Sequence, residues 1–84
     1  MIEQVSLNTL KPGEKGRICG FSLAEDITRR LQDMGLVRGV NVECAYRSPF
    51  GDPTAYLVKG AVIAIRSKES KKITIYCEEK EKWD

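Results

Sequence analysis

Hydrophobic and polar residues between positions 22 and 34 recur with the period of an α-helix. Four apolar residues lie at i, i+4, i+8 and i+11, on one helical face: Leu23, Ile27, Leu31 and Met34. Ser22 and Glu25 have the spacing of a capping box, in which two side chains satisfy the first free N–H groups of a helix. The pattern predicts a helix over residues 23–34 that begins with this cap.

The helix is followed by a glycine and an apolar residue, which together predict how it ends. Gly35 stands where a helix commonly ends with a left-handed residue, a conformation that glycine adopts without steric cost. Leu36 then occupies the position from which it can pack back on Leu31, as in a Schellman motif. A phosphate loop requires glycines before a helix, and a DNA-reading turn requires a second helix after it, so residues 31–39 fit neither.

The rest of the chain shows the short alternating segments that are typical of β-strands. Strands are expected at residues 17–21, 40–47, 54–59, 61–66 and 72–77. In the second of these, alternation places one set of side chains inward: Val40, Val42, Cys44 and Tyr46. The segment AVIAI is apolar throughout, which predicts a strand covered on both faces. Five strands and one helix predict a mainly β protein, a small and strongly bent antiparallel barrel.

The length of 84 residues allows one domain, which we assign to residues 7–77. The remaining segment 78–84, EEKEKWD, is charged and is predicted to be disordered. The sequence MIEQVSLNTL has neither the basic nor the apolar region of a signal peptide, and no apolar run approaches the length of about 20 residues of a membrane-spanning helix. We therefore expect a soluble, cytoplasmic protein.

The residues that carry chemistry are few. The chain has no histidine, and its three cysteines form no CxxC pair, which disfavours a disulfide framework, a zinc site within one chain and a serine-type triad. Asp52 fits a turn residue that bonds its own backbone better than it fits a catalytic acid. We expect no enzyme activity, no cofactor and no metal site within a monomer, while a site between two chains stays open.

The charge balance argues against a nucleic-acid partner. The chain has fourteen basic and twelve acidic residues, which gives a net charge of +2, and aromatic residues make up only 7% of it. Nucleic-acid binders usually present a dense basic face or stacking aromatic side chains. The basic residues are therefore interpreted as solvated surface charges.

Several segments taken in order resemble the FeoA family, small cytoplasmic components of bacterial ferrous iron uptake. These segments are LKPGEKGRI, RLQDMGLVRG, SPFGDP, VKGAVIAIR and the last isoleucine-rich strand. Together they cover nearly the whole chain, from about Leu7 to Tyr76, and their joint order and spacing are more specific than any single piece.

The resemblance implies an SH3-like β-barrel with an inserted helix and no enzymatic activity. It also implies a partner, the cytoplasmic G-protein domain of a FeoB-type membrane iron transporter. The same domain resembles the C-terminal domain of iron-dependent repressors, so the alternative function is a free-standing, metal-responsive regulator. The family supplies no motif that defines an active site, and a homo-oligomer is possible.

A partner of this kind must bind loops or the exposed side of the helix, because the inward-facing residues are committed to the core. One candidate segment is the end of the helix with Arg30, Val37 and Arg38. The other is the SPFGDP loop with Phe50 at its tip. Arginine and aromatic side chains are common anchors of interfaces. Phe50 either folds back over the barrel or remains exposed for a partner, and the sequence leaves both open.

Overall fold

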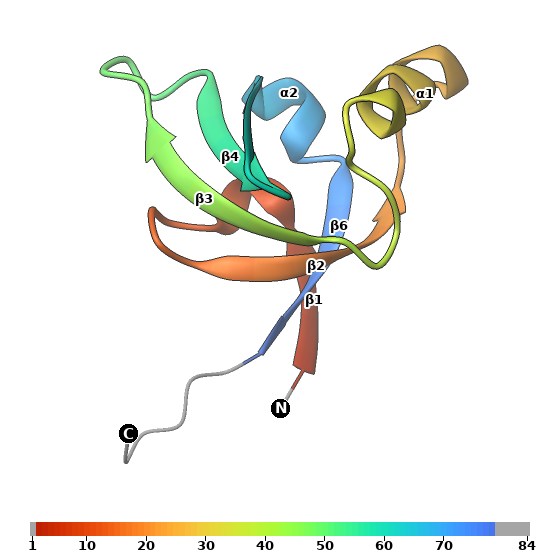
Figure 1. Ribbon diagram of the computed structural model, residues 1–84, viewed down its shortest axis with the longest axis horizontal. Helices are drawn as coiled ribbons and strands as arrows, with labels where there is room; N and C mark the ends of the chain where they lie inside the picture. Colours follow the sequence, from red (N-terminus) through yellow and green to blue (C-terminus); the bar gives the residue numbers. More distant parts are fainter. Residues whose placement is uncertain (1, 79–84) are drawn as a thin grey trace.

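The structure is a computed structural model that describes residues 2–78. Within them, six strands form one antiparallel sheet in the order β1-β6-β2-β3-β4-β5 (Figure 1). The strands are β1 (Ile2–Ser6), β2 (Lys15–Phe21), β3 (Asn41–Arg47), β4 (Thr54–Val58), β5 (Ala61–Ile65) and β6 (Ile73–Glu78). The helices are the 3-10 helix η1 (Leu7–Thr9) and the α-helices α1 (Glu25–Asp33) and α2 (Ser67–Ser70).

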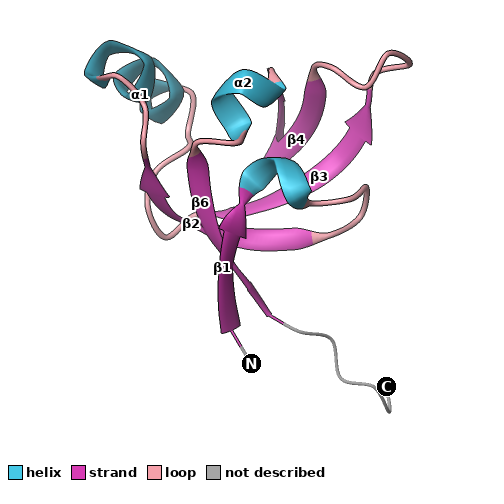
Figure 2. Ribbon diagram, turned by 180° about the vertical axis from the view of Figure 1, so that it is seen from behind, coloured by secondary structure: helices cyan, strands magenta, loops and turns pink. Residues whose placement is uncertain are grey.

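The sheet bends around a single core, and the mainly β, antiparallel class predicted from the sequence is confirmed. Every strand from β2 to β6 contributes buried side chains to this core, and so do η1 and α1. The sheet is not closed, because β1 and β5 are its two edges. Figures 1 and 2 show α1, α2 and the loop between β3 and β4 at the end of the molecule opposite the N-terminus.

Strand β1 lies before the predicted start of the domain at residue 7. All five of its residues pair with β6, from Ile2 opposite Glu78 to Ser6 opposite Thr74. Its sequence IEQVS mixes polar and apolar residues and therefore gave no strand signal. At the other end, Glu78 is the last residue of β6, and residues 79–84 of the predicted disordered segment lie outside the described residues.

The prediction that AVIAI is covered on both faces is wrong. Ile63 and Ile65 are buried, but Val62, which precedes Ile63, is 58% exposed, and Ala64 between the two isoleucines is also exposed. Strand β5 is an edge of the sheet, and a continuous apolar run marks burial on two faces only when another layer covers the second face. Here one face of β5 packs on the core and the other faces solvent.

Strand β3 departs from its predicted alternation at one position. Val40, Val42 and Cys44 are buried as expected, whereas Tyr46 is 60% exposed. The register with β4 shifts between Cys44 and Tyr46. An extra residue in one strand reverses the side to which the following side chains point, so this irregularity turns Tyr46 outward.

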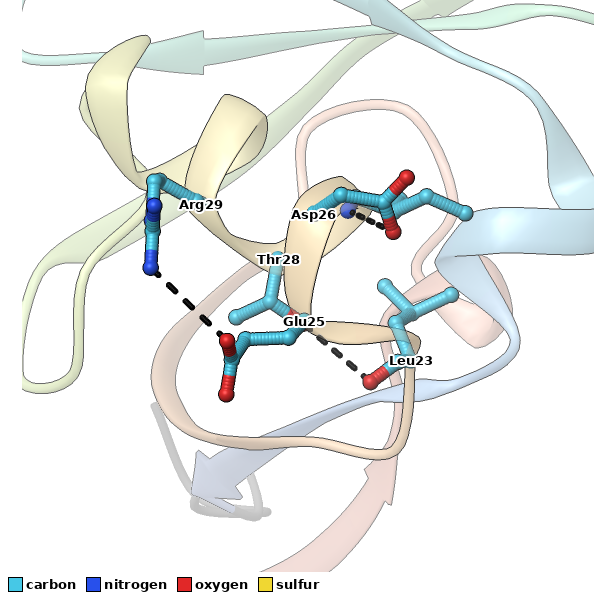
Figure 3. A network of polar contacts seen from close by, with 6 residues as sticks. Leu23, Glu25, Asp26, Thr28 and Arg29 are labelled. Atoms are coloured by element: carbon cyan, nitrogen blue, oxygen red, sulfur yellow. Dashed lines mark hydrogen bonds and ion pairs between the residues drawn. The ribbon is translucent and has the colours of Figure 1, made fainter.

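The predicted capping box at the start of α1 is absent. Ser22 is fixed by its backbone instead, because its N–H donates to the Lys72 carbonyl at 2.8 Å. The cap residue is Ala24, whose side chain has no oxygen, and the helix begins at Glu25. Glu25 thus stands in the first turn, where its carboxylate pairs with Arg29 at 3.8 Å across the helix surface (Figure 3).

The end of α1 matches its prediction. Gly35 has a φ of 109°, in the region that favours glycine. The Leu36 N–H donates to the Leu31 carbonyl and the Gly35 N–H to the Gln32 carbonyl, both at 3.0 Å. These are the two bonds of a Schellman motif. Leu36 is fully buried, so the turn that ends the helix also places an apolar side chain in the core.

Candidate protein-binding surface

Helix α2 connects the two segments that the sequence offered as partner-binding. On one side, the Arg30 guanidinium of α1 pairs with the Glu69 carboxylate of α2 at 2.8 Å. On the other side, the Asp52 carboxylate of the β3–β4 loop accepts a hydrogen bond from the Ser67 N–H of α2 at 2.8 Å. We call the combined region, residues 30–38, 48–53 and 66–70, the helix–loop surface.

The Asp52 contact corrects the interpretation of this residue. Its carboxylate was expected to bond its own backbone, but it caps the first turn of α2, fifteen residues away. The second carboxylate oxygen lies 3.9 Å from the Arg66 guanidinium. A carboxylate at the first N–H groups of a helix is a stabilising arrangement, since those groups have no partner within the helix. Asp52 therefore anchors the base of the loop.

The loop itself is closed by backbone hydrogen bonds, which leave its tip outside. The Gly51 N–H donates to the Ser48 carbonyl at 2.8 Å, and the Ser48 N–H donates to the Pro53 carbonyl at 3.1 Å. Phe50 lies at the tip, and 96% of its surface is exposed. Of the two alternatives left open by the sequence, the structure has the exposed ring.

The helix end presents a second, smaller group of side chains. Val37 is 37% exposed, and Arg38 beside it is exposed and forms no ion pair among residues 2–78. Their backbone is held against β2, because the Gly39 N–H donates to the Ile18 carbonyl at 2.8 Å. Arg30 is already paired with Glu69, so it positions α1 against α2 while part of its side chain stays accessible.

Two features of the surface were missed by the sequence analysis. Met34 was assigned to the inward face of α1 but is 44% exposed beside Val37, because the helix ends at Asp33 and its last apolar position lies outside the core. The exposed residues Arg66, Lys68 and Lys71 make the α2 segment basic. Their signal was visible in the run RSKESKK, which carries one acidic residue.

Two of the three cysteines, Cys44 and Cys77, lie in surroundings that disfavour the thiolate. Cys44 is fully buried, and burial raises the pKa of its thiol. Burial also raises the pKa of Cys77, and the nearby carboxylates of Glu14 and Glu3 raise it further. Metal binding and nucleophilic chemistry both require the thiolate, which these shifts disfavour. Within residues 2–78, no three histidine, cysteine or acidic side chains are grouped to hold a metal ion, and the absence of a tight monomer site stays a prediction.

The same part of the chain contains no helix that is both long and apolar enough to cross a membrane. The longest helix, α1, has nine residues and an exposed, charged outer side.

Comparison with known proteins gives one family and several similar structures. The family model described as FeoA domain matches residues 5–77. No match was found among curated protein sequences.

Three solved structures illustrate the similarity. The FeoA protein from Chlorobium tepidum is 30% identical, with 87% of this chain and 70% of that chain covered and a TM-score of 0.83. The FeoA-like protein from Clostridium acetobutylicum is 27% identical, with coverage of 96% and 94% and a TM-score of 0.83. The zinc complex of FeoA from Stenotrophomonas maltophilia, described as a prokaryotic SH3 domain protein, is 27% identical, with coverage of 84% and 88% and a TM-score of 0.72. The SH3-like fold expected from the sequence is thereby confirmed.

Proposed function

Because this chain belongs to the FeoA domain family, we propose that it is a non-enzymatic accessory protein of ferrous iron transport. In this proposal it binds the cytoplasmic G-protein domain of a FeoB-type transporter through the helix–loop surface. The chain would then act in the cytoplasm and reach the membrane only through its partner.

The exposure of Phe50 is the single observation that carries this proposal. A phenylalanine with 96% of its surface in water forgoes the burial energy of about 1.5–3 kcal/mol that such a side chain gains in an apolar environment. It contributes almost nothing to the core, and the loop around it is closed by its own hydrogen bonds. These bonds hold the backbone that carries the ring, so only the side chain has to be ordered on binding, which favours its use as an anchor.

The other residues of the helix–loop surface provide further side chains of the types that are found at interfaces. Arg38 offers a second anchor of the type enriched at interfaces, and Met34 and Val37 add apolar area beside it. Helix α2 holds the loop and α1 in a fixed relation through the Asp52 and Glu69 contacts. Two exposed anchors on one surface are a better match for a folded domain than for a small molecule, which usually binds in a concave pocket.

Isothermal titration calorimetry with the soluble G domain of the cognate transporter tests the proposal. The domain is titrated in its GDP state and in a state loaded with a non-hydrolysable GTP analogue, and saturable binding is expected in at least one of them. Absence of binding in both states would refute the proposal. A parallel titration with Fe²⁺ under reducing conditions separates this proposal from the regulator alternative. The regulator alternative requires submicromolar Fe²⁺ binding, and this binding must be lost when all three cysteines are replaced by serine.

A further inference from the structure

Strand β5 is an edge of the sheet, and its outer side has the arrangement that allows another strand to pair with it. Strands β4 and β5 form a hairpin through the two-residue turn Lys59-Gly60, whose φ values of 50° and 83° are both positive. In such a turn the flanking residues, Val58 and Ala61, form a hydrogen-bonded pair. Hydrogen-bonded and non-bonded pairs alternate along an antiparallel ladder. Val62 and Ala64, opposite Leu57 and Ala55, are therefore non-bonded positions on β5.

The backbone groups of these two residues point away from β4. Among residues 2–78, neither the Val62 N–H nor the Ala64 N–H has another backbone partner or a side-chain partner. Two donors and two acceptors thus form an open edge, the template that a further antiparallel strand requires. Nothing on β5 blocks it, because the strand contains neither a charged residue nor a proline.

The outward face beside this edge is apolar. Cross-strand pairing aligns Leu57 with Val62 and Tyr46 with Ala55 and Ala64, and Val62 and Tyr46 are 58% and 60% exposed. The other edge of the sheet differs, because β1 presents the exposed polar residues Glu3 and Gln4. A strand added at β5 would extend an apolar face, whereas one added at β1 would meet a charged residue.

The charges at the two ends of β5 favour an added strand with acidic ends over β5 of a second copy. Lys59 precedes the strand and Arg66 follows it, and both are exposed; the Arg66 guanidinium lies 3.9 Å from the Asp52 carboxylate, yet 63% of its side chain remains accessible. In a two-fold pair of β5 with a second copy, centred on Ile63, Arg66 and the Lys59 of the second copy would lie at the same end of the paired strands. Two positive charges gathered at each end repel each other, with nothing of opposite charge on β5 to offset them. Carboxylates at the ends of an added strand would instead be attracted at both places.

We propose that the free edge of β5 binds an extended segment of a partner protein by antiparallel strand addition. The segment has β-branched or apolar residues at its centre and carboxylates at its two ends. The main-chain bonds at Val62 and Ala64 supply the docking geometry, and Lys59 and Arg66 select acidic ends. This site goes beyond the proposed function, because it lies along β5 and shares only Arg66 with the helix–loop surface.

Nuclear magnetic resonance of the ¹⁵N-labelled protein with a synthetic peptide tests the site. The probe is the blocked heptapeptide Glu-Thr-Val-Thr-Val-Thr-Glu, and its matched control replaces both glutamates with lysine. We expect saturable shifts of the Val62 and Ala64 amides and slower hydrogen exchange at these two positions, with binding of the control about tenfold weaker at low salt. No shift at β5, or equal affinity for the two peptides, would overturn the proposal.

Two variants distinguish loss of the strand-pairing N–H group from loss of the fold. Ala64→Pro removes only an N–H that points away from β4, a position at which an edge strand tolerates proline, while Ala64→Ser retains the donor. Peptide binding should be lost in the first variant and kept in the second. If Ala64→Pro unfolds, Val62→Glu serves in its place, and its added carboxylate should abolish the preference for the acidic peptide. Concentration-dependent self-association through β5 without peptide would contradict the proposal. The assay contains no G domain, so its failure and failure of the proposed function are distinguishable.

Discussion

The turn after α1 and the loop between β3 and β4 are built from similar parts but are used in opposite ways. Each contains a glycine with positive φ, Gly35 at 109° and Gly51 at 84°, next to a large apolar residue. In the first, Leu36 is fully buried, whereas in the second Phe50 is 96% exposed. The difference lies in which residue the local hydrogen bonds direct toward the core.

Local geometry explains the contrast. The Schellman bond from the Leu36 N–H to the Leu31 carbonyl folds the chain back on the helix, so the residue after glycine meets the core. In the loop, the bond from the Gly51 N–H to the Ser48 carbonyl closes a tight turn, and Phe50 lies at its outer side. An apolar residue in the first turn stabilises the fold, while one in the second is available to a partner. Substitution of Leu36 should therefore lower the free energy of unfolding, whereas substitution of Phe50 should weaken binding of the partner.

Leu36→Ala should have the largest effect on stability. Removal of a fully buried leucine side chain leaves a cavity, and such substitutions cost about 2–5 kcal/mol. Urea denaturation followed by circular dichroism measures the loss in the free energy of unfolding. Val37→Ala is the matched control, because Val37 is partly exposed and should change stability by only about 0.5 kcal/mol. Similar losses for both variants would mean that the helix end does not direct Leu36 into the core.

Gly35→Val should follow, with a loss of about 1–3 kcal/mol. The backbone at this position has positive φ, which a β-branched residue adopts poorly. Crowding is not the cause, since a Cβ atom added there would meet Val58 Cγ1 at 3.8 Å, an ordinary contact. Gly35→Asn provides the control, because asparagine is the other residue common at this position. An unchanged denaturation midpoint for the valine variant would contradict the left-handed cap.

Asp52→Ala should have a smaller effect, about 0.5–2 kcal/mol, because it removes the carboxylate that caps α2. Asp52→Asn retains a side-chain oxygen that can accept the Ser67 N–H and should lose less. The same denaturation experiment measures both variants. If the two substitutions are equally costly, the hydrogen bond to Ser67 does not anchor the loop.

Features set by neighbouring residues were predictable from the sequence, and features set by distant residues were not. The end of α1 depends on bonds between positions at most five apart, and the sequence of Leu31, Gly35 and Leu36 is sufficient to define it. The start of α1 depends on Lys72, whose carbonyl holds the Ser22 backbone from fifty residues away. A matching capping box could not reveal that competing contact.

The same distinction applies to the strands. Alternation correctly placed Val42 and Cys44 inward, but a shift in register with β4 turned Tyr46 outward. The apolar run of β5 looked like a doubly covered strand, because no local signal states whether a strand lies at the edge of a sheet. Residue type alone located the exposed loop around Phe50, while its connection to α1 through α2 required the pairing of Asp52 with Ser67 and of Arg30 with Glu69.

Calorimetric titration of Phe50→Ala against the soluble transporter G domain tests the central claim most directly. Circular dichroism should show the wild-type fold, because the ring is almost fully exposed. Affinity should fall about thirtyfold, equivalent to about 2 kcal/mol, and Arg38→Glu should also weaken binding. Tyr76→Ala, at a partly exposed aromatic residue on β6, is the control and should bind like the wild type. Wild-type affinity for both Phe50→Ala and Arg38→Glu would contradict the account and place the interface elsewhere.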